Sequence, residues 1–95
     1  GARAAMLSAG LRAGSIQIVG FDGSPGGLMM MRQGWMQANV AQMLSRIGQV
    51  GVETAVSAAR GQTVPERIDT GSFLVLPANL EQFARDSGVI QFMRP

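Results

Sequence analysis

Three short runs rich in apolar residues alternate with helix-forming stretches along the chain, and this alternation constrains the fold more than any other feature. The runs occupy residues 16–20, 36–41 and 72–76. Strands that alternate with helices are typical of α/β proteins, in which right-handed crossovers join the strands of a parallel sheet. The run at 16–20 is apolar almost throughout, so we expect a strand buried on both faces. The sequence therefore predicts an α/β fold with a parallel sheet and flanking helices.

Four helices are predicted from composition and from start and stop signals, at residues 1–13, 24–33, 43–60 and 80–87. Ser24 followed by Pro25 is a helix start, because serine caps a helix and proline fits its first turn. Asn79 with Gln82 has the spacing of a capping box. Gly14, Gly34 and Gly61 mark the ends of the first three helices. Residues 62–71 are expected to be a connector and 88–95 a tail with an extended stretch.

Three strands are few for a parallel sheet, because such a sheet leaves edges and faces uncovered. We therefore expect the sheet of this chain to be incomplete. Pairing with a second copy of the chain and pairing with further polypeptide both remain open. The chain begins at Gly1 rather than with a methionine, and we expect it to be a fragment.

Composition excludes several function classes. The chain has no cysteine and no histidine, which excludes disulfides, thiol nucleophiles and histidine-based catalytic triads. Its eight basic residues are arginines spread singly along the sequence, and only four phenylalanines and one tryptophan are available for stacking, so no nucleic-acid partner is expected. No apolar run approaches the ~18 residues of a membrane span. The acidic residues show no pairing suited to acid–base catalysis, so we expect neither an enzyme nor a bound metal or cofactor.

Two polar residues follow neighbouring predicted strands. Asp22 comes just after the first strand, and Gln42 comes at the end of the second, twenty residues later. Open α/β sheets bind ligands at the carboxyl ends of their strands, so we expect both side chains on one rim, ~5–10 Å apart. A carboxylate accepts hydrogen bonds from hydroxyl groups, and a carboxamide both donates and accepts them. This pair suits a small polyhydroxylated ligand such as a sugar.

Simpler roles remain open for the same residues. Asp22 before Gly23 is also a turn signal, and Gln42 also suits a helix cap or a solvent-exposed position. The glycines between 20 and 27 do not match a dinucleotide-binding motif, and Pro25 removes an amide that a phosphate would need. We interpret Met29, Met30 and Met31 as core and surface residues, and Trp35 as a packing or interface residue at the end of the sheet opposite Asp22. Gly48 and Gly51 within a predicted helix indicate close packing.

Several spaced segments together resemble the carboxy-terminal portion of the type I periplasmic sugar-binding proteins. They are Ile18-Val19-Gly20-Phe21-Asp22-Gly23, Ala38-Asn39-Val40-Ala41-Gln42, Gly48, Gly61 and Leu74-Val75-Leu76 with Asn79. The resemblance covers nearly the whole chain. It implies part of a two-lobed periplasmic-binding-protein type I fold, with residues 1–42 in the carboxy-terminal lobe up to the hinge, 43–71 in the amino-terminal lobe, and 72–95 as a terminal strand, short helix and tail.

The resemblance also implies a function. Asp22 and Gln42 match positions that bind sugar hydroxyls in that family, and Gln42 matches a hinge crossing. A further polar ligand residue of the family would precede Gly1, so this chain would hold less than half of a site. The implied role is the periplasmic solute-binding component of an ABC importer, with a sugar-like ligand and a membrane permease as partners. The alternative is the effector-binding domain of a lactose-repressor-type regulator, which Gly23 and Ala38-Asn39-Val40 disfavour.

Overall fold

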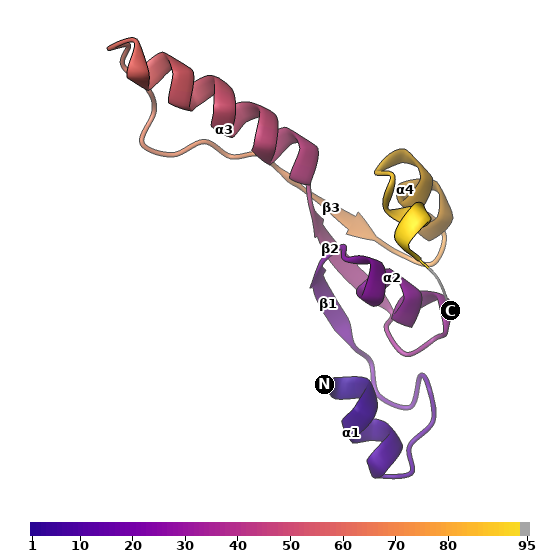
Figure 1. The fold of residues 1–95 in the computed structure, drawn as a ribbon. Coiled ribbons are helices and arrows are strands. Elements are labelled where there is room, and N and C mark those ends of the chain that lie inside the picture. The colour runs from indigo at the N-terminus through magenta and orange to yellow at the C-terminus, as the bar shows by residue number, and fades with distance from the viewer. Residues whose placement is uncertain (94–95) are drawn as a thin grey trace. The chain divides into compact units, whose positions relative to one another are not determined.

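The computed structural model describes residues 1–93 and confirms the alternation of helices and strands (Figure 1). The elements, in chain order, are α1 (Ala2–Ser8), β1 (Val19–Asp22), α2 (Pro25–Arg32), β2 (Ala38–Gln42), α3 (Leu44–Ala59), β3 (Ser72–Val75), α4 (Leu80–Asp86) and a 3-10 turn η1 (Val89–Phe92). The chain divides into two compact units. The first contains residues 1–41 and the described residues from 74 onward, and the second contains residues 42–73.

The sheet has the strand order β1-β2-β3. β1 and β2 are parallel, with Val19 opposite Ala38 and Asp22 opposite Ala41. The predicted α/β class with flanking helices is confirmed, and the sheet as a whole is mixed rather than parallel throughout. Two successive strands run parallel when the segment between them packs on the sheet as a crossover. Residues 43–71, which connect β2 to β3, belong to the second unit and do not form such a crossover. The three predicted strands are confirmed among the described residues.

α2 follows its local signals closely. The Ser24 hydroxyl oxygen accepts a hydrogen bond from the Gly27 backbone N–H at 3.2 Å, and Pro25 is the first helical residue. The helix ends before Gly34, as predicted, where the Trp35 N–H reaches back to the Met30 carbonyl at 2.9 Å. Both ends are therefore set by residues adjacent in sequence.

Several predicted boundaries were wrong. α1 ends at Ser8 rather than at residue 13, because Gly10 takes a left-handed conformation (φ 74°) and the Leu11 N–H closes the last turn on the Met6 carbonyl at 2.9 Å. β1 starts at Val19 and includes Phe21 and Asp22, which were expected in a loop. The tail forms a 3-10 turn at Val89–Phe92 rather than an extended stretch, and its residues 94–95 lie outside the described part.

The predicted capping box at α4 was also wrong. The Asn79 side chain makes no capping hydrogen bond. The Asn79 side-chain oxygen accepts a hydrogen bond from the Leu76 backbone N–H at 2.8 Å, and the side-chain nitrogen donates one to the Leu74 backbone carbonyl at 3.3 Å. Asn79 thus stabilises the turn after β3, because asparagine competes for nearby backbone groups.

The hydrophobic core lies in the first unit and joins the sheet to α2 and α4. Its buried members are Leu28, Met31, Ala41, Val75, Leu80, Ala84 and Met93. Arg32 of α2 and Glu81 of α4 add a two-pronged ion pair at the surface, with nitrogen–oxygen distances of 2.9 and 2.8 Å. No described residue covers the face of β1 that carries Val19 (66% exposed) and Phe21 (62%), so the expected burial of this strand on both faces was wrong.

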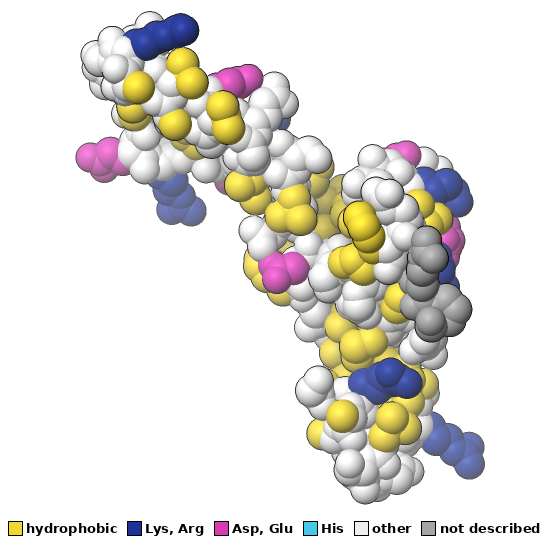
Figure 2. Space-filling model, in the orientation of Figure 1, with side chains coloured by type: hydrophobic (Ala, Val, Ile, Leu, Met, Phe, Trp, Pro, Cys, Tyr) yellow, Lys and Arg dark blue, Asp and Glu magenta, His cyan; other side chains and the backbone are white. Residues whose placement is uncertain are grey.

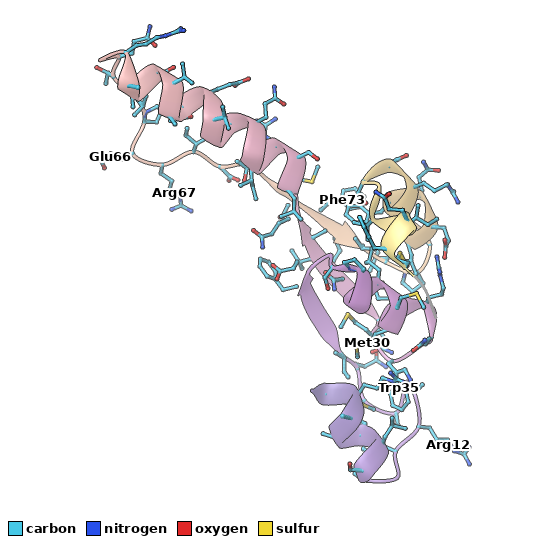
Figure 3. The ribbon with its side chains drawn as sticks, viewed as in Figure 1. Arg12, Met30, Trp35, Glu66, Arg67 and Phe73 are labelled. Carbon is cyan, nitrogen blue, oxygen red and sulfur yellow. The ribbon has the colours of Figure 1, made fainter. Side chains whose placement is uncertain are left out.

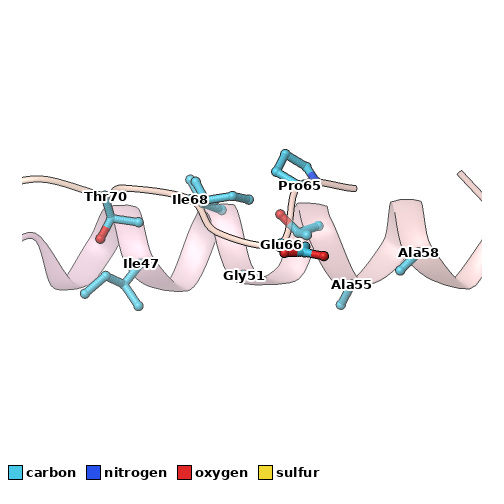
Figure 4. Close-up of a pocket in the computed structure, with 10 residues that line it drawn as sticks. Ile47, Gly51, Ala55, Ala58, Pro65, Glu66, Ile68 and Thr70 are labelled. Carbon is cyan, nitrogen blue, oxygen red and sulfur yellow. The ribbon is translucent and has the colours of Figure 1, made fainter. Parts of the chain in front are cut away.

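The second unit consists of α3 and the connector that follows it. None of residues 42–73 is buried, and apolar side chains such as Leu44 (62% exposed) and Val52 (67%) lie on its surface. Figure 2 shows hydrophobic side chains, in yellow, on the surface of this unit. Between α3 and the connector lies an open groove of about 440 Å³, lined by Ile47 and Ala55 on one side and Ile68 on the other (Figure 4). The groove is mainly apolar and contains neither predicted ligand residue.

Candidate functional site

Asp22 is the last residue of β1, and its backbone is strained. Its φ of 89° is left-handed, and it is the only non-glycine residue with a positive φ in the part of the chain that the structure describes. Such a conformation costs about 1–2 kcal/mol for an ordinary L-residue and somewhat less for Asp or Asn. The side chain is exposed. Residues held in such strained backbone conformations are concentrated at binding and active sites.

Gln42 is the last residue of β2 and is half-buried. Asp22 is opposite Ala41 in the parallel register, so Gln42 lies one residue beyond the partner of Asp22. The two predicted site residues thus end adjacent parallel strands at the same edge of the sheet. This is the arrangement that the sequence spacing predicted; their role as ligands stays a prediction.

Asn39, the second residue of β2, contacts the candidate site, and the sequence pattern did not reveal this contact. It is 1% exposed, and its side-chain oxygen accepts a hydrogen bond from the Gly23 N–H at 2.7 Å. It therefore contacts the turn that directly follows Asp22. The available signal was a second polar residue, besides Gln42, in a mostly apolar strand, because a buried carboxamide needs a specific partner.

The other candidates have packing roles. Trp35 (Figure 3) precedes β2, so it lies at the opposite end of the strands from Asp22, as predicted. The Arg3 guanidinium carbon lies 6.0 Å from the centroid of the Trp35 ring. Met31 is buried in the core, and Met29 packs against that core. A Cβ added to Gly20 or to Gly27 would lie 2.9 Å from the Asn39 amide nitrogen, so these glycines make room for a side chain.

Titratable groups add little to this site. The hydrogen bond from Arg32 holds the pKa of Glu81 below its usual value, but this pair joins two helices. Among residues 1–93, no three His, Cys, Asp or Glu side chains are grouped to hold a metal ion. None of the helices in that range has both the length and the hydropathy of a membrane span.

Sequence comparison identifies relatives over most of the chain. The ribose import binding protein of Escherichia coli is 36% identical over 76 residues, which are 80% of this chain and 25% of that protein. Its counterpart in Haemophilus influenzae is 40% identical over 53 residues, covering 56% of this chain and 18% of the relative. The chain thus spans about a quarter of the length of the curated relatives it matches. No protein-family model matches it.

Solved structures agree. An ABC transporter solute-binding protein from Agrobacterium vitis, solved with bound D-fucose, superimposes with a TM-score of 0.74 and 28% sequence identity. The match covers 90% of this chain and 29% of the chain of that protein. A second one from the same organism, bound to α-D-tagatopyranose, gives a TM-score of 0.72 and 28% identity over 99% and 30%. The chain is therefore a homologue of the ribose import binding proteins and of sugar-binding ABC transporter solute-binding proteins, and its fold is part of the type I periplasmic binding protein fold.

Proposed function

We propose that this chain contributes the carboxyl edge of β1 and β2 to the sugar site of an ABC-importer solute-binding protein. One observation carries the proposal: Asp22 and Gln42 end adjacent parallel strands at one edge of the sheet, in a homologue of ribose import binding proteins. Open α/β sheets bind ligands at this edge. The protein acts as a receptor rather than an enzyme.

The side-chain chemistry of the edge selects hydroxyl groups. The Asp22 carboxylate accepts hydrogen bonds from sugar hydroxyls, and the Gln42 carboxamide accepts and donates at a neighbouring hydroxyl. A ligand without a matching hydroxyl leaves these groups unsatisfied and binds less well. Related structures contain D-fucose, D-arabinose and α-D-tagatopyranose, which supports a monosaccharide-sized ligand.

The two units fit a receptor that closes on its ligand. We assign residues 1–42 and 72–95 to one lobe and its terminal elements, and residues 43–71 to the other lobe. The separation of residues 42–73 as a compact unit supports this assignment. Gln42 then stands at the crossing between lobes, where a ligand contact would favour the closed state. The closed state is what a membrane permease would recognise in the periplasm.

The test is a sugar titration followed by NMR on the ¹⁵N-labelled chain, a method that detects dissociation constants in the millimolar range. D-ribose, D-fucose, D-arabinose and D-tagatose are the ligands, and a polyol of similar size without a ring is the control. We expect saturable shifts centred on residues 20–24 and 41–43 with at least one sugar. Shifts that are absent, or that match those caused by the polyol, would contradict the proposal.

A further inference from the structure

Asn39 is the only buried polar side chain in the described part of the chain. Burying a carboxamide costs free energy unless its hydrogen-bonding groups find partners. Asn39 meets this condition: its oxygen accepts from the Gly23 N–H at 2.7 Å, and its nitrogen approaches the Met36 sulfur at 3.4 Å. A buried polar group with a defined partner fixes one local arrangement.

The partner of Asn39 belongs to an unusual turn. Asp22 and Gly23 are consecutive left-handed residues, with φ values of 89° and 68°. This conformation takes the Gly23 N–H out of the regular strand, and the Asn39 oxygen accepts its hydrogen bond. Without this acceptor a buried N–H would be unsatisfied, or the turn would relax toward a commoner conformation.

The surroundings of Asn39 hold its side chain in place. An added Cβ would lie 2.9 Å from the Asn39 nitrogen at both Gly20 and Gly27, which come from β1 and α2. The carboxamide therefore fills space between two backbones that approach closely because both residues are glycines. A side chain enclosed in this way has little rotamer freedom, so its acceptor oxygen is held at a fixed position under the turn.

We propose that Asn39 is a positioning residue for the ligand site: through the Gly23 N–H it holds the Asp22–Gly23 turn, and thereby the Asp22 carboxylate, in the orientation that binds a sugar hydroxyl. The sugar-binding part of this inference rests on the proposed function. The positioned carboxylate loses less conformational entropy on binding, which raises affinity without a new contact. Asn39 itself is enclosed by protein and does not contact the ligand.

The test combines Asn39→Leu with Asp22→Ala. In the sugar titration, Asn39→Leu should weaken binding about tenfold when Asp22 is present, but by less than about twofold in the Asp22→Ala background, because a residue that acts through Asp22 is coupled to it. Equal weakening in both backgrounds would overturn the positioning role, since Asn39 would then act through general stability.

Gln37→Met is the matched control. The Gln37 side-chain oxygen accepts from the Ile18 N–H at 2.7 Å, so it makes the same kind of bond between neighbouring segments at the other end of β1. Gln37→Met should lower thermal stability as Asn39→Leu does, and should leave sugar affinity within about twofold of the original. A comparable loss of affinity in Gln37→Met would show that losing any bond of this kind weakens sugar binding. That result would contradict a specific role for Asn39.

A second measurement separates this inference from the proposed function. In Asn39→Leu, the Gly23 N–H should exchange with solvent at least about tenfold faster, and the HN–Hα coupling of Asp22 should change, while amides of α4 keep their protection. If no sugar binds the original chain, the proposed function fails, and with it the ligand part of this inference. The exchange and coupling measurements then test by themselves whether Asn39 holds the turn in place. An unchanged Gly23 exchange rate and an unchanged Asp22 coupling would refute that structural role.

Discussion

Gly23 packs directly against Ala41: a Cβ added to Gly23 would lie 2.6 Å from the Ala41 Cβ. Gly23 also has a φ of 68°, so Gly23→Ala suffers both left-handed strain and a steric clash. Gly10 has a similar φ of 74° with no atom within 4 Å of such a Cβ, which makes Gly10→Ala a matched control for strain alone.

We expect Gly10→Ala to cost about 1–2 kcal/mol of unfolding free energy, and Gly23→Ala about 1–3 kcal/mol more. Urea unfolding monitored by the fluorescence of Trp35, the single tryptophan, measures both in the first unit. Equal losses in the two variants would show that the turn moves away from Ala41 without cost.

The Arg32–Glu81 ion pair gives a pH-dependent stability. The Arg32 hydrogen bond lowers the pKa of Glu81 in the folded chain below its ordinary value of 4.5. A depressed carboxyl pKa stabilises the fold above the unfolded-state pKa, and this contribution disappears as the pH falls through the folded-state pKa. Glu81→Gln should therefore lower the melting temperature at neutral pH, by a small amount because the pair is exposed, and should have no effect in strong acid.

The control for this pair is Glu66→Gln, which removes the same charge from the connector in the second unit. It should leave the melting temperature of the first unit nearly unchanged at every pH. A Glu81→Gln effect that persists in strong acid would point to packing rather than to the ion pair.

Gly48 lies inside α3 with no atom within 4 Å of an added Cβ. Gly48→Ala should therefore stabilise the helix by up to about 1 kcal/mol, because glycine is the poorest helix former after proline and nothing opposes the methyl group. Circular dichroism at increasing temperature measures the gain in helicity. Gly27→Ala in α2, where the Cβ would lie 2.9 Å from the Asn39 nitrogen, should lack that gain. Equal gains at both positions would contradict the tight packing around Asn39.

The proposed ligand role makes separate demands on Asp22 and Gln42. Asp22→Ala should weaken sugar binding by at least about 1.5–3 kcal/mol, because it removes hydrogen bonds to a charged acceptor. Gln42→Leu should cost about 0.5–1.5 kcal/mol, since its hydrogen bonds are neutral. Both are measured by the titration described above, with Gln62→Leu in the connector as a control. An affinity unchanged by Asp22→Ala would remove Asp22 from the site.

Local signals predicted the elements whose ends depend on neighbouring residues. α2 begins at its Ser24 cap and ends at Gly34 because both devices act within one turn of helix. Asp22 and Gln42 could be placed at one edge because parallel strands leave their carboxyl ends together. These inferences needed only strand order and spacing.

Long-range relationships were out of reach of the sequence pattern. The direction of β3 depends on residues 43–71 forming a separate unit, which no local propensity encodes. The role of Asn39 depends on a hydrogen bond with Gly23, sixteen residues away in the sequence, which no local pattern indicates. The capping box failed at Asn79 because its side chain found backbone partners in the preceding turn.

The edge position of β1 has a consequence for how the chain behaves in solution. In the sheet formed by the described residues, β1 is an outer strand, and the exposed Val19 and Phe21 side chains stand beside its open backbone. An outer strand with apolar side chains is a template on which another strand can be added through main-chain hydrogen bonds. We therefore expect self-association in concentrated solution to begin with strand addition at β1, and the same edge offers a place for a further strand of the sheet.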